Sequence, residues 1–76
     1  MAKVPVVTAR QAETAFNRVG YFLSRIKGSH RILRHPEREH NLTLPGPENR
    51  RLAKGMLRAL IRTAGLTVDE FSELLE

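Results

Sequence analysis

Apolar residues between positions 8 and 20 recur at intervals of three and four, which is the spacing of one helical face. Thr8 followed three residues later by Gln11 is the pattern of an N-terminal capping box, in which each side chain bonds the backbone N–H of the other residue. Gly20 suits the position after a helix end, where a left-handed backbone is common. This pattern predicts a helix that begins after Thr8 and is closed by Gly20. Its apolar face consists of Ala12, Ala15, Phe16 and Val19.

The next segment changes to the composition of β-strands. Residues 21–26 and 29–35 are rich in aromatic and branched side chains, and Lys27-Gly28 lies between them. We predict a hairpin with a two-residue loop at Lys27-Gly28, which places Arg25 opposite His30. Alternation alone does not decide which side of this hairpin is buried. It groups Tyr21, Leu23 and Ile32 with His30, and it places Phe22, Ile26 and Leu33 on the opposite side.

Proline and glycine mark the boundaries of the remaining elements. Residues 40–44 have the pattern of a short third strand, and Pro45 ends it. From Glu48 to Gly65 the apolar period is helical, with Arg and Lys on the other side. A second capping box at Thr67 and Glu70 predicts a short last helix. The apolar stripe of the long helix consists of Leu52, Met56, Leu57, Leu60, Ile61 and Ala64.

The order of these elements is helix, three antiparallel strands, helix and short helix. We therefore predict an α+β fold in which helices cover one face of a three-stranded sheet. The order α-β-β-β-α is also that of the double-stranded-RNA-binding fold, which recognises RNA through its shape, its phosphates and its 2′-hydroxyls. A chain of 76 residues is close to the lower size limit for unaided folding, so residues 1–76 are expected to form a single domain.

Charge is unevenly distributed along the chain. It contains 13 Lys and Arg against 8 Asp and Glu, which leaves a net charge of +5. This balance favours a polyanionic partner such as nucleic acid, although solubility alone also accounts for many basic proteins. The acidic residues of the C-terminal end are Asp69, Glu70, Glu73 and Glu76. The basic residues of the middle are Arg25, Lys27, Arg31, Arg34, Arg38, Arg50, Arg51, Lys54, Arg58 and Arg62.

Composition excludes or disfavours several functional classes. The chain has no cysteine, which excludes a disulfide scaffold and a thiolate zinc site. The three histidines follow one another at intervals of five, a spacing that does not by itself bring metal ligands together. No apolar run is long enough for a membrane span or a signal sequence. We expect a cytoplasmic protein with no metal, no cofactor and no membrane partner.

His30 is the candidate residue for chemistry. An imidazole can accept and donate protons near neutral pH, so it can take the proton of an RNA 2′-hydroxyl or supply one to the leaving 5′-oxygen. A neighbouring Arg or Lys can stabilise the charge that develops on the phosphorane oxygens without a metal ion. The alternative is a structural strand histidine bonded to the backbone. His35 and His40 are interpreted as polar turn residues, because one precedes Pro36 and the other starts a strand.

Four stretches of the chain resemble the HicA family of toxins, small ribosome-independent mRNA interferases of toxin-antitoxin systems. They are VGYFLSRIKGSHRILRHP from Val19 to Pro36, LTLP at the end of the third strand, LAKGMLRALIRTAGL in the long helix, and the closing TVDEF. The first stretch is similar to the family's order of glycine, aromatic residue, strand, GSH, strand and HP. KGSH followed at this distance by a helix of the KGxLRxxI type is the most specific part of the likeness.

The resemblance implies a double-stranded-RNA-binding-like fold and an endoribonuclease toxin that cleaves mRNA. It also implies that His30, the histidine of the GSH motif, is the catalytic residue and acts as general acid or base. Around His30 we expect the substrate to contact Arg25, Lys27, Gly28, Ser29 and Arg31. The expected substrate is single-stranded or locally unpaired mRNA, and the expected protein partner is a HicB-like antitoxin that covers the toxin.

One stretch departs from the family pattern. Many members carry a second histidine shortly after the third-strand proline, whereas this chain has Pro45-Gly46-Pro47 there. The departure leaves three alternatives: weakened activity, a substitute such as Lys27 or Arg25, or a mechanism that needs only one histidine. Two other functions are also compatible with the sequence. One is a non-catalytic RNA-binding module of the same fold, and the other is a protein-interaction domain whose charge serves only solubility.

Overall fold

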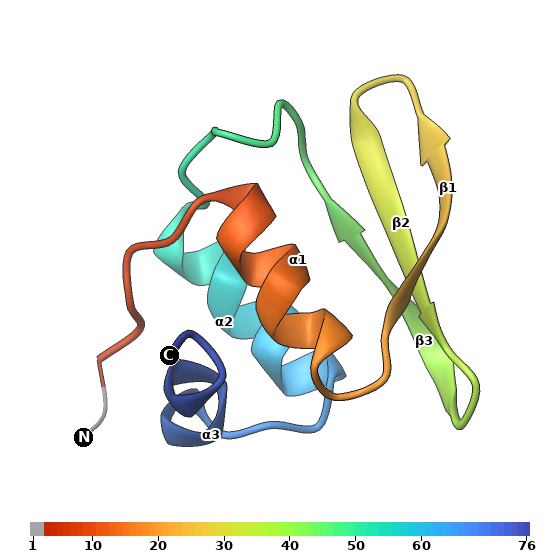
Figure 1. The fold of residues 1–76 in the computed structure, drawn as a ribbon. Coiled ribbons are helices and arrows are strands. Elements are labelled where there is room, and N and C mark those ends of the chain that lie inside the picture. The colour runs from red at the N-terminus through yellow and green to blue at the C-terminus, as the bar shows by residue number, and fades with distance from the viewer. Residues whose placement is uncertain (1–2) are drawn as a thin grey trace.

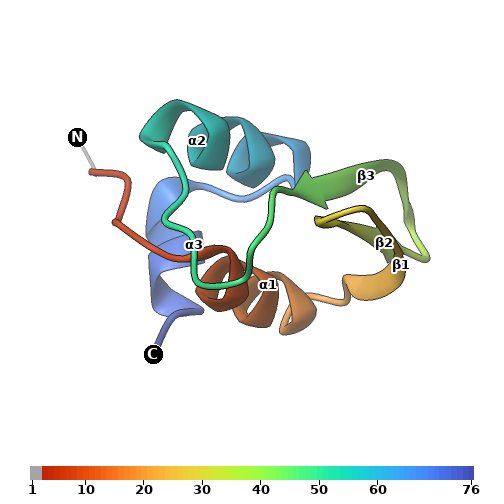
Figure 2. The same cartoon turned by 90° about the horizontal axis from the view of Figure 1, so that it is seen from above.

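In the computed structural model, which describes residues 3–76, helices cover one face of a three-stranded antiparallel sheet (Figure 1). The elements are α1 (Ala9–Asn17), β1 (Phe22–Lys27), β2 (His30–His35), β3 (Arg38–Leu44), α2 (Lys54–Thr63) and α3 (Val68–Glu73). Seen from above, the strands lie at one end of the molecule and the helices at the other (Figure 2). The order α-β-β-β-α followed by a short helix confirms the predicted α+β fold.

The capping box predicted at the first helix is present. The Gln11 backbone N–H donates to the Thr8 hydroxyl at 3.2 Å, and the Thr8 backbone N–H donates to the Gln11 side-chain oxygen at 2.8 Å. Gly20 has a φ of 102°, the left-handed conformation expected of a residue that closes a helix. The regular part of α1 stops at Asn17, so the turn that ends at Gly20 is longer than the pattern indicated.

The predicted start of the long helix at Glu48 is wrong, because α2 begins at Lys54. Residues 48–52 instead run beside the start of α1. The backbone N–H groups of the first two residues of α1 donate to the carbonyls of Arg50 and Glu48, both at 2.9 Å. N–H groups in the first turn of a helix have no partner within that helix, so these carbonyls satisfy them. Leu52 precedes the helix but is buried in the core. Its apolar side chain continued the helical period towards Glu48 and so led to the wrong start.

The core lies between the helices and the inner face of the sheet. Phe16 of α1 packs against Phe71 of α3 with ring centroids 5.1 Å apart. α3 begins with the second predicted capping box, at Thr67 and Glu70, and Phe71 is its buried residue. Met56, which the pattern assigned to the apolar stripe of α2, is exposed. The largest fully buried side chains are Phe16, Phe71, Leu33, Leu42, Leu44 and Leu57.

The hairpin loop is displaced by one residue from its predicted position. The loop is Gly28-Ser29, so Lys27 pairs with His30 and Arg25 pairs with Ile32. Gly28 has a φ of 63°, whereas no residue other than glycine among those described has a positive φ. A loop at Lys27-Gly28 with glycine in second place would have required a positive φ at the lysine as well. Glycine in first place of the loop avoids that cost and sets the observed register.

Candidate nucleic-acid interface

The sheet has an inner face against the helices and an exposed outer face. Residues directly opposite each other in an antiparallel pair share a face, so the pairs can be followed across the strands. Leu33 pairs with Leu42, and both are buried. The residues on either side of Leu33 therefore point outwards. The outer face consists of Phe22, Arg25 and Lys27 of β1, His30, Ile32 and Arg34 of β2, and Thr43 of β3.

A β-bulge decides which side chains of β1 reach the outer face. The register of β1 against β2 shifts between Leu23 and Arg25, so Ser24 is an extra residue in the strand. Leu23 pairs with inner-face Leu33, whereas Phe22 pairs with Arg34. Strict alternation had grouped Leu23 with His30 and Phe22 with Leu33, so this part of the prediction is wrong. The bulge places an aromatic ring beside the cations of the outer face.

His30 begins β2 directly after the loop, and its side chain is exposed. Within residues 3–76 no side-chain hydrogen bond holds the His30 ring, which leaves both ring nitrogens accessible to a substrate. Lys27 lies directly opposite it, and such pairs have Cβ atoms about 5 Å apart. Arg25 was predicted opposite His30 but lies one pair further along, opposite Ile32. Lys27 is therefore the cation nearest to His30 across the hairpin.

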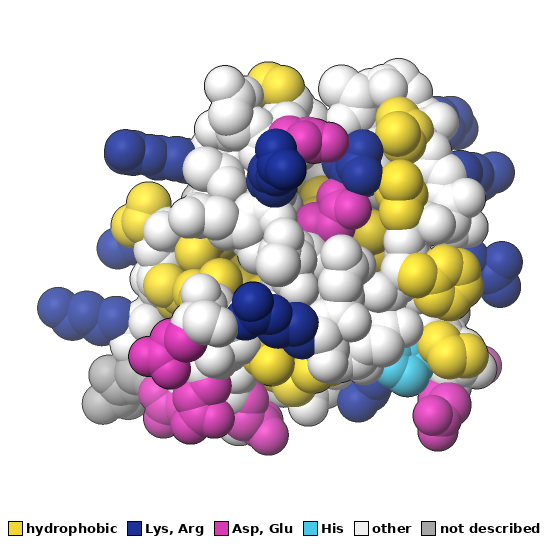
Figure 3. Space-filling view, viewed as in Figure 1, with side chains coloured by type: hydrophobic (Ala, Val, Ile, Leu, Met, Phe, Trp, Pro, Cys, Tyr) yellow, Lys and Arg dark blue, Asp and Glu magenta, His cyan; other side chains and the backbone are white. Residues whose placement is uncertain are grey.

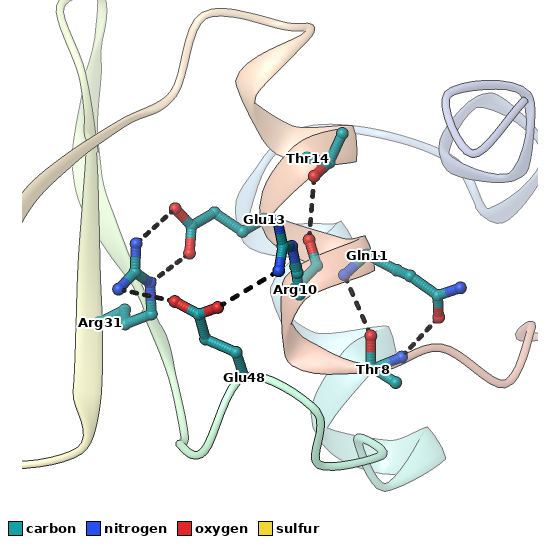
Figure 4. A network of polar contacts seen from close by, with 7 residues as sticks. All are labelled: Thr8, Arg10, Gln11, Glu13, Thr14, Arg31 and Glu48. Carbon is teal, nitrogen blue, oxygen red and sulfur yellow. Dashed lines mark hydrogen bonds and ion pairs between the residues drawn. The ribbon is translucent and has the colours of Figure 1, made fainter.

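Arg31 follows His30 in the chain but points to the inner face. Its guanidinium donates to both carboxylate oxygens of Glu13, at 2.5 and 3.0 Å, and lies 3.2 Å from Glu48 (Figure 4). The hydrogen bond with Glu13 raises the pKa of Arg31, burial opposes this rise, and the charges of Glu13 and Glu48 support it. The side chain is only 18% exposed. Two carboxylates thus engage Arg31 on the side of the sheet away from His30.

His35, at the other end of β2, has both ring nitrogens engaged. One accepts a hydrogen bond from the Glu37 backbone N–H at 3.0 Å, so the other carries the hydrogen and donates to the Val19 carbonyl at 2.9 Å. A Cβ at Gly20 would lie 2.6 Å from this second nitrogen. The ring also meets Tyr21 edge to face, with centroids 4.9 Å apart. These contacts give His35 a structural role, and they explain why glycine and an aromatic residue precede β1.

Lys and Arg side chains project both from the side of the molecule on which the strands lie and from the opposite, helical side, and one group of Asp and Glu side chains gathers near α3 (Figure 3). The acidic C-terminal end is therefore a separate cluster in space, whereas the basic side chains are spread over both sides of the molecule. Phe22 and Arg34 are the outer-face residues that sequence reasoning missed. Counting every second residue from His30 would have found Arg34, because Ile32 and Arg34 continue its face. No comparable count finds Phe22, because the bulge interrupts the alternation.

The part of the chain that the structure describes contains no cluster of three or more His, Cys, Asp or Glu side chains arranged to hold a metal ion. None of its helices has the length and apolar character needed to cross a membrane. A family model described as the HicA toxin of bacterial toxin-antitoxin systems matches residues 9–66. This range runs from the start of α1 through all three strands to the end of α2. A search of curated proteins found no match.

Proposed function

The chain belongs to the HicA family of toxins, and on that premise we propose that it is a metal-independent mRNA endonuclease whose reaction centre is His30. Membership makes it the toxin of a toxin-antitoxin system, with a nuclease kind of activity, an RNA substrate and an antitoxin partner. The single observation that carries the assignment to His30 is its position. It lies on an exposed cationic sheet face, with Lys27 directly opposite.

In the proposed reaction His30 acts as a general base. Its ring nitrogen takes the proton of a 2′-hydroxyl, and the 2′-oxygen forms a bond to the adjacent phosphorus. The bond from phosphorus to the 5′-oxygen breaks, and the leaving oxygen takes a proton from water. The hydroxide formed in this way takes the proton from the His30 imidazolium, which restores the base. The products are a 2′,3′-cyclic phosphate and a 5′-hydroxyl end. Pro45-Gly46-Pro47 supplies no second histidine, so the scheme uses one imidazole.

Lys27 and Arg25 supply the positive charge that this reaction needs. Both lie on the outer face of β1, and Lys27 is the closer to His30 in the observed register. A fixed cation stabilises the negative charge that develops on the phosphorane oxygens. We assign the scissile phosphate to Lys27 and a neighbouring phosphate to Arg25. Arg31 was expected to contact the substrate, but its bonds to Glu13 and Glu48 favour a supporting role.

Unpaired RNA is the substrate that fits the outer face best. Phe22 is 50% exposed and lies on the same face as Arg25 and Arg34. Aromatic rings bind unpaired bases by stacking, while arginines bind the backbone phosphates. A base stacked on Phe22 would place the following phosphates along the cations towards His30. Gly28 and Ser29 form the loop beside this path, and they can present backbone N–H groups to a phosphate.

We infer that the antitoxin is HicB-like and acidic, and that the pair acts in the cytoplasm. We also infer that residues 1–76 work as one HicA-like unit. α3 lies beyond the matched range, but Phe71 joins it to Phe16 of α1 in the same core. Removing α3 would expose that core.

Cleavage of a labelled unpaired RNA in the presence of a chelator tests the assignment. Wild-type protein should cut, and His30→Ala should lower the rate about 10²- to 10⁴-fold, the usual range for a general base. His40→Ala is the matched control, because His40 is also an exposed strand histidine. A folded His30→Ala variant that cuts at the wild-type rate would exclude His30. Binding of duplex RNA without cleavage by wild-type protein would favour the non-catalytic RNA-binding module.

A further inference from the structure

Gly46 packs directly against the loop that precedes His30. It is buried, and a Cβ added to it would lie 2.8 Å from the Ser29 Cβ, 3.0 Å from the Ser29 carbonyl carbon and closer still to the carbonyl oxygen. Gly46 has no positive φ, so its backbone conformation does not require glycine. The requirement is space, because the backbone of residue 46 approaches the backbone of residue 29 too closely for any side chain.

The segment that contains Gly46 is itself held by the start of α1. The backbone N–H groups of Ala9 and Arg10 donate to Arg50 and Glu48, and the Leu52 N–H donates to the Val7 carbonyl, all at 2.9 Å. The first two of these bonds use N–H groups that α1 cannot satisfy internally. Residues 46–52 are therefore fixed to the rigid, helical side of the molecule.

The same segment reaches the other neighbour of His30. Glu48 contacts Arg31 at 3.2 Å, and Glu13 of α1 holds the same guanidinium through two hydrogen bonds (Figure 4). Ser29 is thus supported by Gly46, and Arg31 is supported by Glu48 and Glu13. His30 lies between these two supported residues, with its own side chain pointing to the opposite face. β1, in contrast, is exposed along its whole length and offers the loop little support.

We propose that residues 45–48 form a support that positions His30, with Gly46 as the principal positioning residue. The kinetic part of this proposal rests on the proposed function, whereas its structural part does not. An exposed residue at the end of a hairpin changes its direction readily when the loop moves. A displacement of about 1 Å at a reacting group can lower a rate about 100-fold. The close backbone contact at Gly46 removes that freedom, and the ion pairs of Arg31 oppose it from the next residue.

Gly46→Ala is the direct test, and Gly55→Ala is its matched control. A Cβ at Gly55 meets nothing within 4 Å, so the control makes the same chemical change without a contact. Heteronuclear NMR of the full chain reports the backbone amides of residues 28–30, and cleavage of a labelled RNA reports kcat and KM. We expect Gly46→Ala to move those amide signals and to lower kcat about 10- to 100-fold, with KM changed less than about threefold. Gly55→Ala should change neither readout.

Unmoved amide signals at residues 28–30 in folded Gly46→Ala would overturn the proposal. Moved signals with an unchanged kcat would overturn the positioning role and leave only the packing contact. If Gly46→Ala does not fold, Glu48→Gln tests the proposal instead. It should move the Arg31 and His30 amide signals and lower kcat. Unmoved amide signals or an unchanged kcat in this variant would overturn the proposal. A normal rate in folded His30→Ala would refute the proposed function separately, because the NMR readout does not depend on it.

Discussion

The two ends of β2 carry the same residue type in opposite situations. His30 begins the strand on the exposed outer face, opposite Lys27, whereas His35 ends it with both nitrogens bonded to backbone groups and its ring against Tyr21. A histidine whose nitrogens are both occupied holds structure, and one with accessible nitrogens can exchange protons with a substrate. The surroundings of an imidazole, and not its presence in a motif, therefore distinguish a proton-transfer group from a structural one.

The largest effects are expected at the two histidines, where one substitution should affect cleavage and the other stability. His30→Ala should remove cleavage and leave the unfolding temperature within about 2 °C of wild type, because an exposed side chain contributes little to stability. His35→Ala removes two hydrogen bonds worth about 1 kcal/mol each, so it should lower the unfolding free energy by about 2 kcal/mol and the midpoint by about 10 °C. Thermal denaturation and cleavage below the midpoint separate the two losses.

A His35→Ala variant that keeps wild-type stability but cannot cut would make His35 part of the reaction centre. His40→Ala serves again as control, and it should leave both quantities close to those of wild type. Gly20→Ala tests the packing around His35, because its Cβ would lie 2.6 Å from a His35 nitrogen. Its cost should be smaller in the His35→Ala background, where the added methyl group has room.

A smaller effect is expected for Lys27, which lies opposite His30. Lys27→Ala should lower kcat about 10-fold, equivalent to about 1.4 kcal/mol, because it removes one cation from the developing phosphorane. Lys27→Arg should restore most of the rate, since the charge returns to the same place. Arg31→Ala provides the contrast: it should reduce stability by leaving the partly buried Glu13 without its partner. Steady-state cleavage and denaturant unfolding of each variant provide the measurements.

Equal rates in the Lys27→Ala and wild-type proteins would remove Lys27 from the mechanism and make Arg25 the next candidate. If Arg31→Ala instead weakened RNA binding without any loss of stability, Arg31 would belong to the substrate-binding set after all.

The smallest effect is expected at Tyr21, beside His35. Burial raises the pKa of Tyr21 above its ordinary value of 10.0, and the charge of Arg38 partly opposes this rise. The folded protein therefore keeps the phenolic proton at a pH where the unfolded chain loses it. This contribution to stability is complete below about pH 10 and is lost as the pH rises through the raised pKa. Tyr21 is the only tyrosine, so tyrosinate absorbance follows it directly.

Tyr21→Phe should abolish the absorbance change and flatten the alkaline decrease in stability. Its effect at neutral pH should be below about 0.5 kcal/mol, because the buried hydroxyl has no hydrogen-bond partner among the residues described. A folded protein that titrates at or below 10.0 would contradict the predicted shift.

Local signals in the sequence predicted the elements well where the interactions are local. The capping boxes at Thr8 and Thr67 join residues three positions apart, so they can be read directly from the chain, and both are present. Gly20 was also identified from its place directly after the helical pattern, and it has the expected positive φ. The prediction of the start of α2 was wrong because Leu52 continues the apolar period of the helix. Leu52 in fact belongs to a segment whose backbone is hydrogen-bonded to the start of α1.

The candidate site was predicted only in part. The resemblance to the family singled out His30, and its exposure is compatible with the proposed role. The predicted position of the hairpin loop was wrong by one residue. Lys27 therefore lies opposite His30, where Arg25 had been predicted. The bulge at Ser24 then reversed the sides of Phe22 and Leu23. The displaced loop shifted the cross-strand pairs by two positions and kept Arg25 and Lys27 on the face of His30. The bulge adds one residue to β1, and in a strand with a period of two one extra residue exchanges the two faces.

The order of the elements, the helix caps, the uneven charge along the chain and the family follow from the sequence alone, because they depend on neighbouring residues or on motifs. The three-dimensional structure was needed to show which side of the hairpin is buried, which cation lies opposite His30, and why Arg31 turns away from it. It also revealed the contact between Gly46 and Ser29. These features depend on backbones and charges that lie far apart in the chain, and no local pattern records how closely they approach one another.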